Sequence, residues 1–172
     1  RFADYVCNNS QVTFSTGMCM TRSGDDVINM SSMAEDALEK AKGREVERES
    51  VKNAVCCFQQ VVSYDDFCNL LEEEKQLEDL SQRYELSTGY IYSLLDLCDD
   101  ASAAGEDFKR AMWRSKLGYR TTRFVETNKK IESENKDSAA DLILQQIGNA
   151  VQQYKTNYKI ALSIWLYQHR EN

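Results

Sequence analysis

The fold is indicated most clearly near the end of the chain, where residues 136–165 read KDSAADLILQQIGNAVQQYKTNYKIALSIW. Apolar side chains recur there at alternating steps of four and three residues, the spacing of one face of an amphipathic α-helix. The positions on this face are Ala140, Leu144, Ile147, Val151, Tyr154, Tyr158, Ala161 and Trp165. We expect one long helix that packs along its neighbours in a single-chain bundle. An intermolecular coiled coil is the alternative, but the mixed, partly aromatic face favours the bundle.

Earlier segments predict further helices. Apolar residues between Val27 and Ala41 share one helical face, with Gly43 as a joint after it. Ser63, with Asp65 and Asp66 in the turn after it, is typical of a helix start, because its hydroxyl caps free N–H groups and the acids favour the positive end of the helix. The remaining expectations are a helix through residues 51–62, an interruption at 87–89 before a short helix, a loop over 99–105, and a helical stretch over 106–130 divided at Gly118.

Composition supports a helical protein. The 172 residues contain no proline and only seven glycines, whereas an all-β protein would need many more turn residues. The fold class that we expect is all-α, a disulfide-stapled helical bundle with a long C-terminal amphipathic helix. We expect a single domain over residues 1–172, with an irregular arm (1–24), an acidic cysteine-rich portion (25–104) and a mildly basic portion without cysteine (105–172).

Cysteines and glycosylation motifs indicate a secreted protein. An even number of cysteines fits three disulfides, which persist in oxidising compartments. They are Cys7, Cys19, Cys56, Cys57, Cys68 and Cys98. Asn8 and Asn29 begin Asn-X-Ser sequons, and the chain opens at Arg1 as a mature terminus or a boundary would. The alternative is an intracellular protein whose cysteines are buried free thiols.

The spacing of the cysteines suggests some pairings. Cys56 and Cys57 are expected on a helix, where neighbours point about 100° apart, so they should reach different elements. An antiparallel helix pair that turns at Ser63 would bring Cys57 beside Cys68, and Cys56 is almost as well placed. The other bridges should tie the N-terminal arm and Cys98 to this pair, which leaves the connectivity open.

Several function classes find no support in the sequence. The only histidine, His169, lies three residues before the last one, where chain ends tend to fray, so a Ser-His-Asp or Cys-His site is not expected. Neither a phosphate-binding glycine loop nor metal-ligand spacing occurs, so we expect no enzyme, no cofactor and no metal site. An acidic chain is a poor nucleic-acid binder, and no apolar run approaches the roughly 18 residues that span a membrane.

The six cysteines and the closing helix through Trp165 give the chain a family resemblance. In architecture it resembles the C-terminal helical domain of the aegyptin family of mosquito salivary anti-platelet proteins. The resemblance implies a secreted protein that binds collagen, masks it from a host receptor and inhibits platelet adhesion. It implies no particular binding residues.

A collagen-binding role would need a surface that meets the basic side chains of a triple helix. Exposed carboxylates of the acidic portion are the candidates, with tyrosines adding apolar area. They are Glu72, Glu73, Glu74, Asp99 and Asp100. Two other classes stay open: a helical cytokine-like or receptor-ectodomain protein, and a carrier of a small hydrophobic ligand between its helices.

Overall fold

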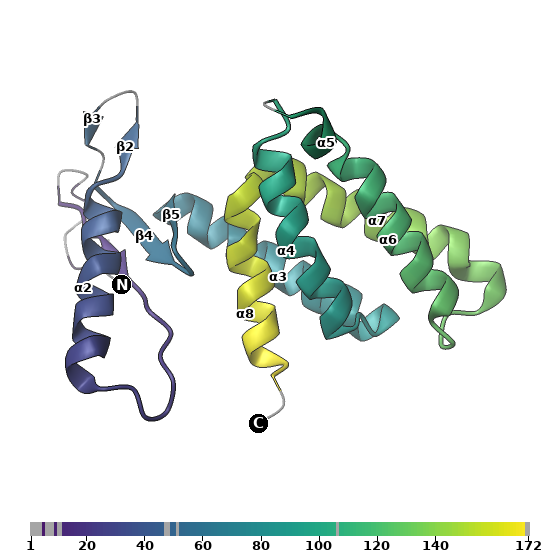
Figure 1. Ribbon diagram of the computed structural model, residues 1–172, viewed down its shortest axis with the longest axis horizontal. Helices are drawn as coiled ribbons and strands as arrows, with labels where there is room; N and C mark the ends of the chain where they lie inside the picture. The colour runs from purple at the N-terminus through teal and green to yellow at the C-terminus, as the bar shows by residue number, and fades with distance from the viewer. Residues whose placement is uncertain are drawn as a thin grey trace. The chain divides into compact units, whose positions relative to one another are not determined.

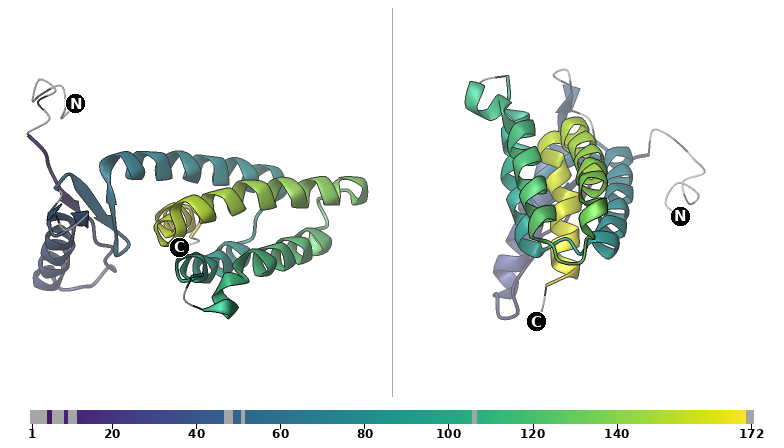
Figure 2. Two further views of the ribbon diagram at one scale, coloured as in Figure 1. Left: turned by 90° about the horizontal axis from the view of Figure 1, so that it is seen from above. Right: turned by 90° about the vertical axis from the view of Figure 1, so that its right-hand side faces the viewer.

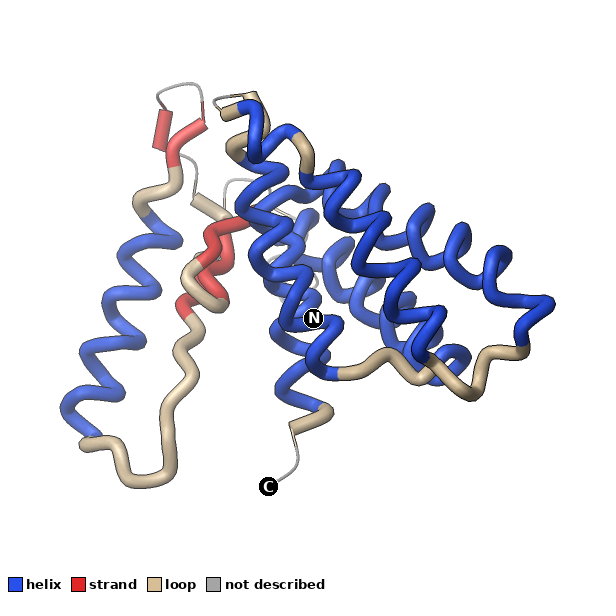
Figure 3. The backbone as a smooth tube through the Cα atoms, turned by 45° about the vertical axis from the view of Figure 1, so that its right-hand side comes forward, coloured by secondary structure: helices blue, strands red, loops and turns tan. Residues whose placement is uncertain are grey.

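The computed structural model describes residues 5, 9, 12–46, 49–50, 52–105 and 107–170. The chain separates into two compact units, unit 1 (Arg1–Cys68) and unit 2 (Asn69–Asn172). Figure 1 labels the helices and strands of both, and Figure 3 shows the strands confined to unit 1 within the described residues. Each unit is described separately, and the prediction of a single domain stays a prediction.

Unit 1 consists of one helix and a small sheet. Helix α2 (Val27–Lys42) begins after Asp26, whose side chain accepts a hydrogen bond from the Ile28 N–H, and ends at Gly43 as the sequence predicted. The sheet has the order β1-β4-β5, with β1 (Thr16–Gly17) parallel to β4 (Ala54–Cys57) and β4 antiparallel to β5 (Gln60–Ser63). A separate pair joins β2 (Glu45–Val46) to β3 (Glu49–Ser50).

The helix predicted over residues 51–62 was wrong, because this segment is the β4–β5 hairpin. Its two turn residues, Phe58 and Gln59, both have positive φ (49° and 65°), which is the backbone of the tight turn that matches strand twist. Asn-Gly is the usual sequence of this turn, so Phe-Gln gave no signal. All four residues of β4 are buried, and a short buried apolar run does not by itself distinguish strand from helix.

Small residues let the layers of unit 1 approach closely. Gly17 in β1 lies against α2, where an added Cβ would come within 2.2 Å of the Leu38 backbone nitrogen. Any other residue at position 17 would therefore push β1 away from α2. The buried core beside this contact consists of small side chains, with Val61 packed at its edge. They are Ala37, Ala41, Ala54 and Cys56. The N-terminal arm is thus not wholly irregular, since it supplies a strand.

Unit 2 begins within α3 (Tyr64–Tyr84), whose first turns belong to unit 1. The predicted start at Ser63 is confirmed: its hydroxyl accepts from the Asp66 N–H at 3.0 Å and donates to the Asp66 carboxylate at 2.7 Å. Helix α4 (Thr88–Ser102) starts at the predicted interruption, with the Ser87 hydroxyl accepting from the Tyr90 N–H at 3.1 Å. The loop predicted over 99–105 was wrong for its first half, because α4 continues to Ser102.

Two helices follow in place of the stretch predicted over 106–130. They are α5 (Phe108–Ala111) and α6 (Trp113–Thr127). The division falls at Met112, which ends α5 and precedes α6, so the expected break at Gly118 was wrong. Helix α6 packs on α4 through a buried hydrogen bond of 2.7 Å between the hydroxyls of Tyr90 and Thr121.

The long closing helix is divided into two. After the 3-10 turn η1 (Ser133–Asn135) come α7 (Lys136–Tyr154), the 3-10 turn η2 (Lys155–Tyr158) and α8 (Lys159–Gln168). The chain turns sharply at Lys155, which has a φ of 49°, so that Figure 2 (left) shows α7 lengthwise and α8 nearly end-on. Helix α8 lies beside α4 in both Figure 1 and this view. A single continuous helix was therefore wrong, although the chain is helical on both sides of the turn, as predicted.

Large apolar side chains fill the core of unit 2. Its fully buried members come from α3, α4, α7, η2 and α8. They include Leu70, Leu77, Ile91, Leu94, Leu97, Ile143, Ile147, Tyr158, Ile160, Leu162 and Trp165. The protein is thus mostly helical, as predicted, with the small sheet of unit 1 as the exception. None of the helices in the described ranges combines the length and apolar character that a membrane crossing requires.

Candidate functional site

A groove lies between α4 and α8 in unit 2. It consists of two adjoining hollows of about 340 Å³ and 320 Å³, which share Tyr92, Leu166 and Arg170 in their walls. We call it the tyrosine groove. Its full lining is Thr88, Tyr92, Leu95, Ser163, Leu166, Tyr167, His169 and Arg170.

Helical spacing explains why these side chains share one surface. The lining residues of α4 lie four and three positions apart, and Ser163, Leu166 and Tyr167 are likewise one face of α8. Leu166 is buried, whereas Tyr92 and Tyr167 expose 60% and 44% of their surface. A groove with an apolar floor, two exposed aromatic rings and an arginine could contact an extended peptide segment.

A cluster around His169 adjoins one end of the groove. Glu78 of α3 accepts a hydrogen bond from the Trp165 indole N–H at 2.9 Å, and the same carboxylate oxygen lies 3.2 Å from His169 Nε2. The imidazole stacks on the Trp165 ring at a centroid distance of 4.0 Å. Glu74, one turn earlier on α3, is only 8% exposed. Burial is the main cause that raises the pKa of its carboxyl, and nearby Glu78 raises it further, while His169 and Lys75 act in the opposite direction. The cluster joins α8 to α3.

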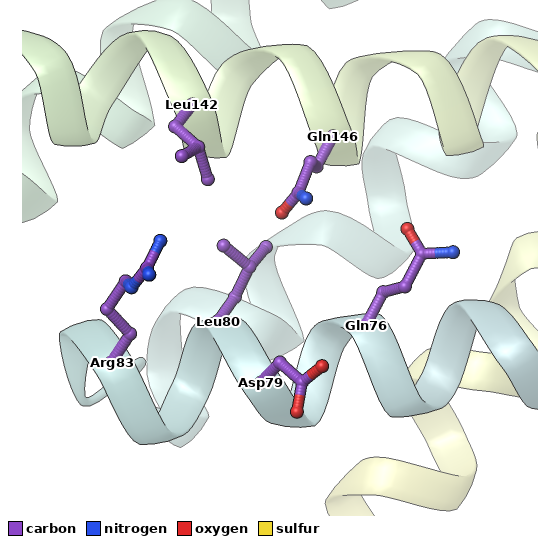
Figure 4. A pocket seen from close by; sticks show the side chains of 6 residues that line it. All are labelled: Gln76, Asp79, Leu80, Arg83, Leu142 and Gln146. Atoms are coloured by element: carbon purple, nitrogen blue, oxygen red, sulfur yellow. The ribbon is translucent and has the colours of Figure 1, made fainter.

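A separate hollow of about 340 Å³ lies between α3 and α7 (Figure 4). Leu80 and Leu142 extend into it from opposite helices, and polar side chains surround them. These are Gln76, Asp79, Arg83 and Gln146. Sites for small hydrophobic ligands are lined mainly by apolar groups, so this mixed lining does not favour the carrier interpretation.

The predicted acidic site divides into two places, and most of its carboxylates have basic partners. Glu72 pairs with Lys75 at 2.7 Å, and Glu74 is buried, so its prediction as an exposed carboxylate was wrong. Glu73 is partly buried, and burial raises the pKa of its carboxyl. At the end of α4, Asp99 lies 2.6 Å from the Lys159 ammonium and Asp100 lies 2.6 Å from that of Lys116. These aspartates hold neighbouring elements of unit 2 together.

The cysteines form no disulfide among those that the structure describes. Cys56 and Cys57 are buried in β4, Cys68 is exposed and Cys19 is partly exposed, whereas Cys7 lies outside the described residues. The helix pair that was to join Cys57 to Cys68 does not exist, because Cys57 lies on a strand. Cys98 is fully buried in α4 and is the one cysteine in the sequence of unit 2, so no bridge within that unit is possible.

Burial also sets the chemistry of these thiols. Desolvation raises the pKa of Cys57 to about 11 and that of Cys98 to about 12. Both are therefore protonated at neutral pH, unlike the thiolates that serve as nucleophiles or metal ligands. In the described part of the chain, no group of three or more His, Cys, Asp and Glu side chains could hold a metal ion.

Of the two predicted glycosylation asparagines, Asn8 and Asn29, the structure describes one. Asn29 is exposed in the first turn of α2, where its side chain is accessible, while Asn8 lies outside the described residues.

The sequence pattern did not identify the His169 cluster, although two signals were present. Trp165 and His169 are four residues apart, as are Glu74 and Glu78, and such pairs share a helical face. That the two pairs face each other depends on the turn at Lys155, which the pattern did not predict.

Comparisons with protein-family models, with curated proteins and with solved structures find no match to this chain. The site must therefore be interpreted from its own geometry.

Proposed function

We propose that this chain is a binding protein that holds an extracellular protein in the tyrosine groove, with collagen as the leading candidate. The observation that carries the proposal is the pair of exposed tyrosines, Tyr92 and Tyr167, over the buried Leu166. Tyrosine combines a large apolar ring with a hydroxyl and loses little conformational entropy on binding, which makes it effective at interfaces.

The groove suits the conformation of collagen chains. Each strand of the triple helix is an extended polyproline helix with a solvated backbone and regularly spaced side chains. Grooves lined by aromatic rings are a recurrent means of binding this conformation, because its rigid backbone costs little entropy to immobilise. Arg170 at the edge of the groove can meet a carboxylate of the ligand. One edge of the collagen triple helix would enter the tyrosine groove.

The acidic side chains are a weaker basis for binding. Glu72, Asp99 and Asp100 already have lysine partners within the protein, so a basic ligand would have to displace them. Exposed ion pairs contribute only about 0–1 kcal/mol each. We therefore assign the contact to the groove. The masking of collagen from platelets rests on the resemblance to the aegyptin family, and secretion rests on the sequons at Asn8 and Asn29, because the described cysteines form no disulfide.

Binding to immobilised fibrillar collagen tests this proposal. We expect Tyr92→Ser and Tyr167→Ser each to weaken binding about 5- to 30-fold, the effect of truncating an aromatic anchor worth roughly 1–2 kcal/mol. Tyr119→Ser is the matched control, because Tyr119 is also exposed (65%) but lies on α6 and outside the groove. It should bind as the unchanged protein does.

Salt distinguishes the groove from the acidic side chains. Contacts dominated by aromatic area should change little as salt is raised, whereas paired charges weaken as the Debye length falls from about 10 Å at 0.1 M to about 3 Å at 1 M. Equal losses in all three tyrosine variants, or strong salt dependence, would contradict the groove. No collagen binding at micromolar protein would favour a helical cytokine-like or receptor-ectodomain role instead.

A further inference from the structure

Both ring nitrogens of His169 face oxygen atoms that accept hydrogen bonds. Nδ1 lies 2.9 Å from the Trp165 carbonyl oxygen, and Nε2 lies 3.2 Å from the Glu78 carboxylate. A neutral imidazole carries one N–H and can satisfy only one of these acceptors, whereas the imidazolium ion satisfies both. The geometry therefore matches the charged form of the side chain.

Charged groups from more than one element face His169. From α3, Glu78 and the buried Glu74 face it, with Lys75 beside them as the opposing charge. From α4, the groove residues Thr88 and Tyr92 are uncharged, and Arg170 follows on the chain itself. His169 also occupies the C-cap of α8, where the helix dipole favours a cation.

We propose that protonation of His169 fastens the end of α8 to α3 and thereby orders the tyrosine groove, so that the groove binds more tightly in mildly acidic solution. This inference rests on the proposed function of the groove. When the proton leaves, the ring keeps one N–H, so it loses its hydrogen bond either to the Trp165 carbonyl or to the Glu78 carboxylate, and the unprotonated nitrogen then faces an oxygen that repels its lone pair. The last turn of α8 loosens, and with it the groove residues Leu166 and Tyr167.

The direction of the pH effect follows from which form of the His169 ring makes more hydrogen bonds. The imidazolium ion makes two hydrogen bonds and the neutral ring one, so the contact is stronger in the charged form, and histidine side chains in general change charge between about pH 5 and 8. His169→Gln removes the positive charge at every pH. His169→Arg keeps a positive charge, and its guanidinium group can still stack on the Trp165 ring. The two variants thus fix the groove in its weaker and tighter states.

Nuclear magnetic resonance tests the proposed contact between His169 and α3 without any ligand. His169 is the only histidine, and the two tryptophans, Trp113 and Trp165, give two indole N–H signals. We expect the Trp165 signal, whose hydrogen bond goes to Glu78, to move along the same pH curve as the His169 ring. The Trp113 signal should not follow that curve. A Trp165 signal that stays fixed while His169 titrates would overturn the proposal.

Collagen binding at about pH 5.5 and pH 7.5 tests the consequence for the groove. The unchanged protein should bind about three to ten times more tightly at the lower pH, the scale of one ordinary intramolecular hydrogen bond. His169→Gln should bind weakly and His169→Arg tightly at both values. Equal binding by the unchanged protein at both pH values would reject the regulation and leave the groove standing. If collagen binds at neither pH, the proposed function fails. The indole signals alone then decide whether protonated His169 joins the end of α8 to α3.

Discussion

Unit 1 and unit 2 bury their interiors in opposite ways. The core of unit 1 contains mainly small side chains such as Ala37, Ala41 and Cys56, with Val55 and Val62 as its larger members, and β1 approaches α2 closely at Gly17. The core of unit 2 is made of interlocking large side chains, among them Trp165 and Tyr158. Buried apolar area is the main stabilising contribution, so unit 2 should be the more stable of the two. Stability in unit 1 depends on backbone fit, whereas stability in unit 2 depends on side-chain volume.

The largest effect that we expect is from Gly17→Val. The first added carbon would lie 2.2 Å from the Leu38 nitrogen and 2.7 Å from the Ala37 carbonyl carbon, both of them backbone atoms that cannot rotate away. The cost should be about 3 kcal/mol or more, enough to unfold most of a small unit. Amide hydrogen exchange should show protection lost in unit 1 and retained in unit 2.

Gly118→Ala is the matched control in unit 2. Nothing lies within 4 Å of a Cβ at Gly118, which is inside α6, so this change should stabilise the helix by about 0.5–1 kcal/mol. If Gly17→Val left unit 1 folded, the distinction between backbone fit and side-chain volume would be lost.

Leu94→Ala tests the volume-dependent core of unit 2. Leu94 is fully buried on α4, so its truncation should cost about 2–5 kcal/mol through lost burial and the cavity left behind. Thermal unfolding should show the loss in unit 2 alone. Asp96→Ala on the same helix is exposed and should change stability by less than about 0.5 kcal/mol. Comparable losses in both variants would contradict the assigned core.

A smaller effect is expected where α4 and α6 share a buried hydrogen bond. Tyr90→Phe would leave the hydroxyl of Thr121, which has no exposed surface, without its partner at 2.7 Å. The expected cost is about 1–3 kcal/mol. Adding Thr121→Val removes the second hydroxyl and should recover much of this loss, as chemical denaturation can measure. A double variant no more stable than Tyr90→Phe would argue against the pair.

The smallest effect concerns pH and the buried carboxyls of α3. Burial is the main cause that raises the pKa of both Glu73 and Glu74, so the native state holds their protons more tightly than the unfolded state. Their contribution is complete below the unfolded value near 4.5 and is lost as pH rises through the folded values. The melting temperature of unit 2 should therefore rise on mild acidification, and less so in Glu74→Gln. A rise of the same size in that variant would remove Glu74 from this explanation.

The same contrast explains what the sequence could and could not predict. Large apolar residues at helical spacing identified the helices of unit 2, and Ser63 and Ser87 marked two of their starts correctly. The β4–β5 hairpin was not predicted, because its turn, Phe58-Gln59, has neither glycine nor asparagine and its apolar spacing also fits a helix.

The turn at Lys155 was the other main difference. Helical periodicity continues across residues 155–158, so the local sequence did not indicate that the chain changes direction there. The tyrosine groove depends on that turn, because it carries α8 alongside α4. The predicted acidic site, in contrast, relied on charge alone, and charge does not reveal that Asp99 and Asp100 have partners within the protein.

The position of a bound triple-helical collagen peptide on the protein is the most direct test of the central claim. In amide and side-chain NMR spectra recorded with and without the peptide, we predict that changes concentrate on the tyrosine groove, above all at Tyr92, Leu166 and Tyr167. Changes centred on Glu72, Asp99 and Asp100, or on unit 1, with the groove signals unmoved, would contradict the account.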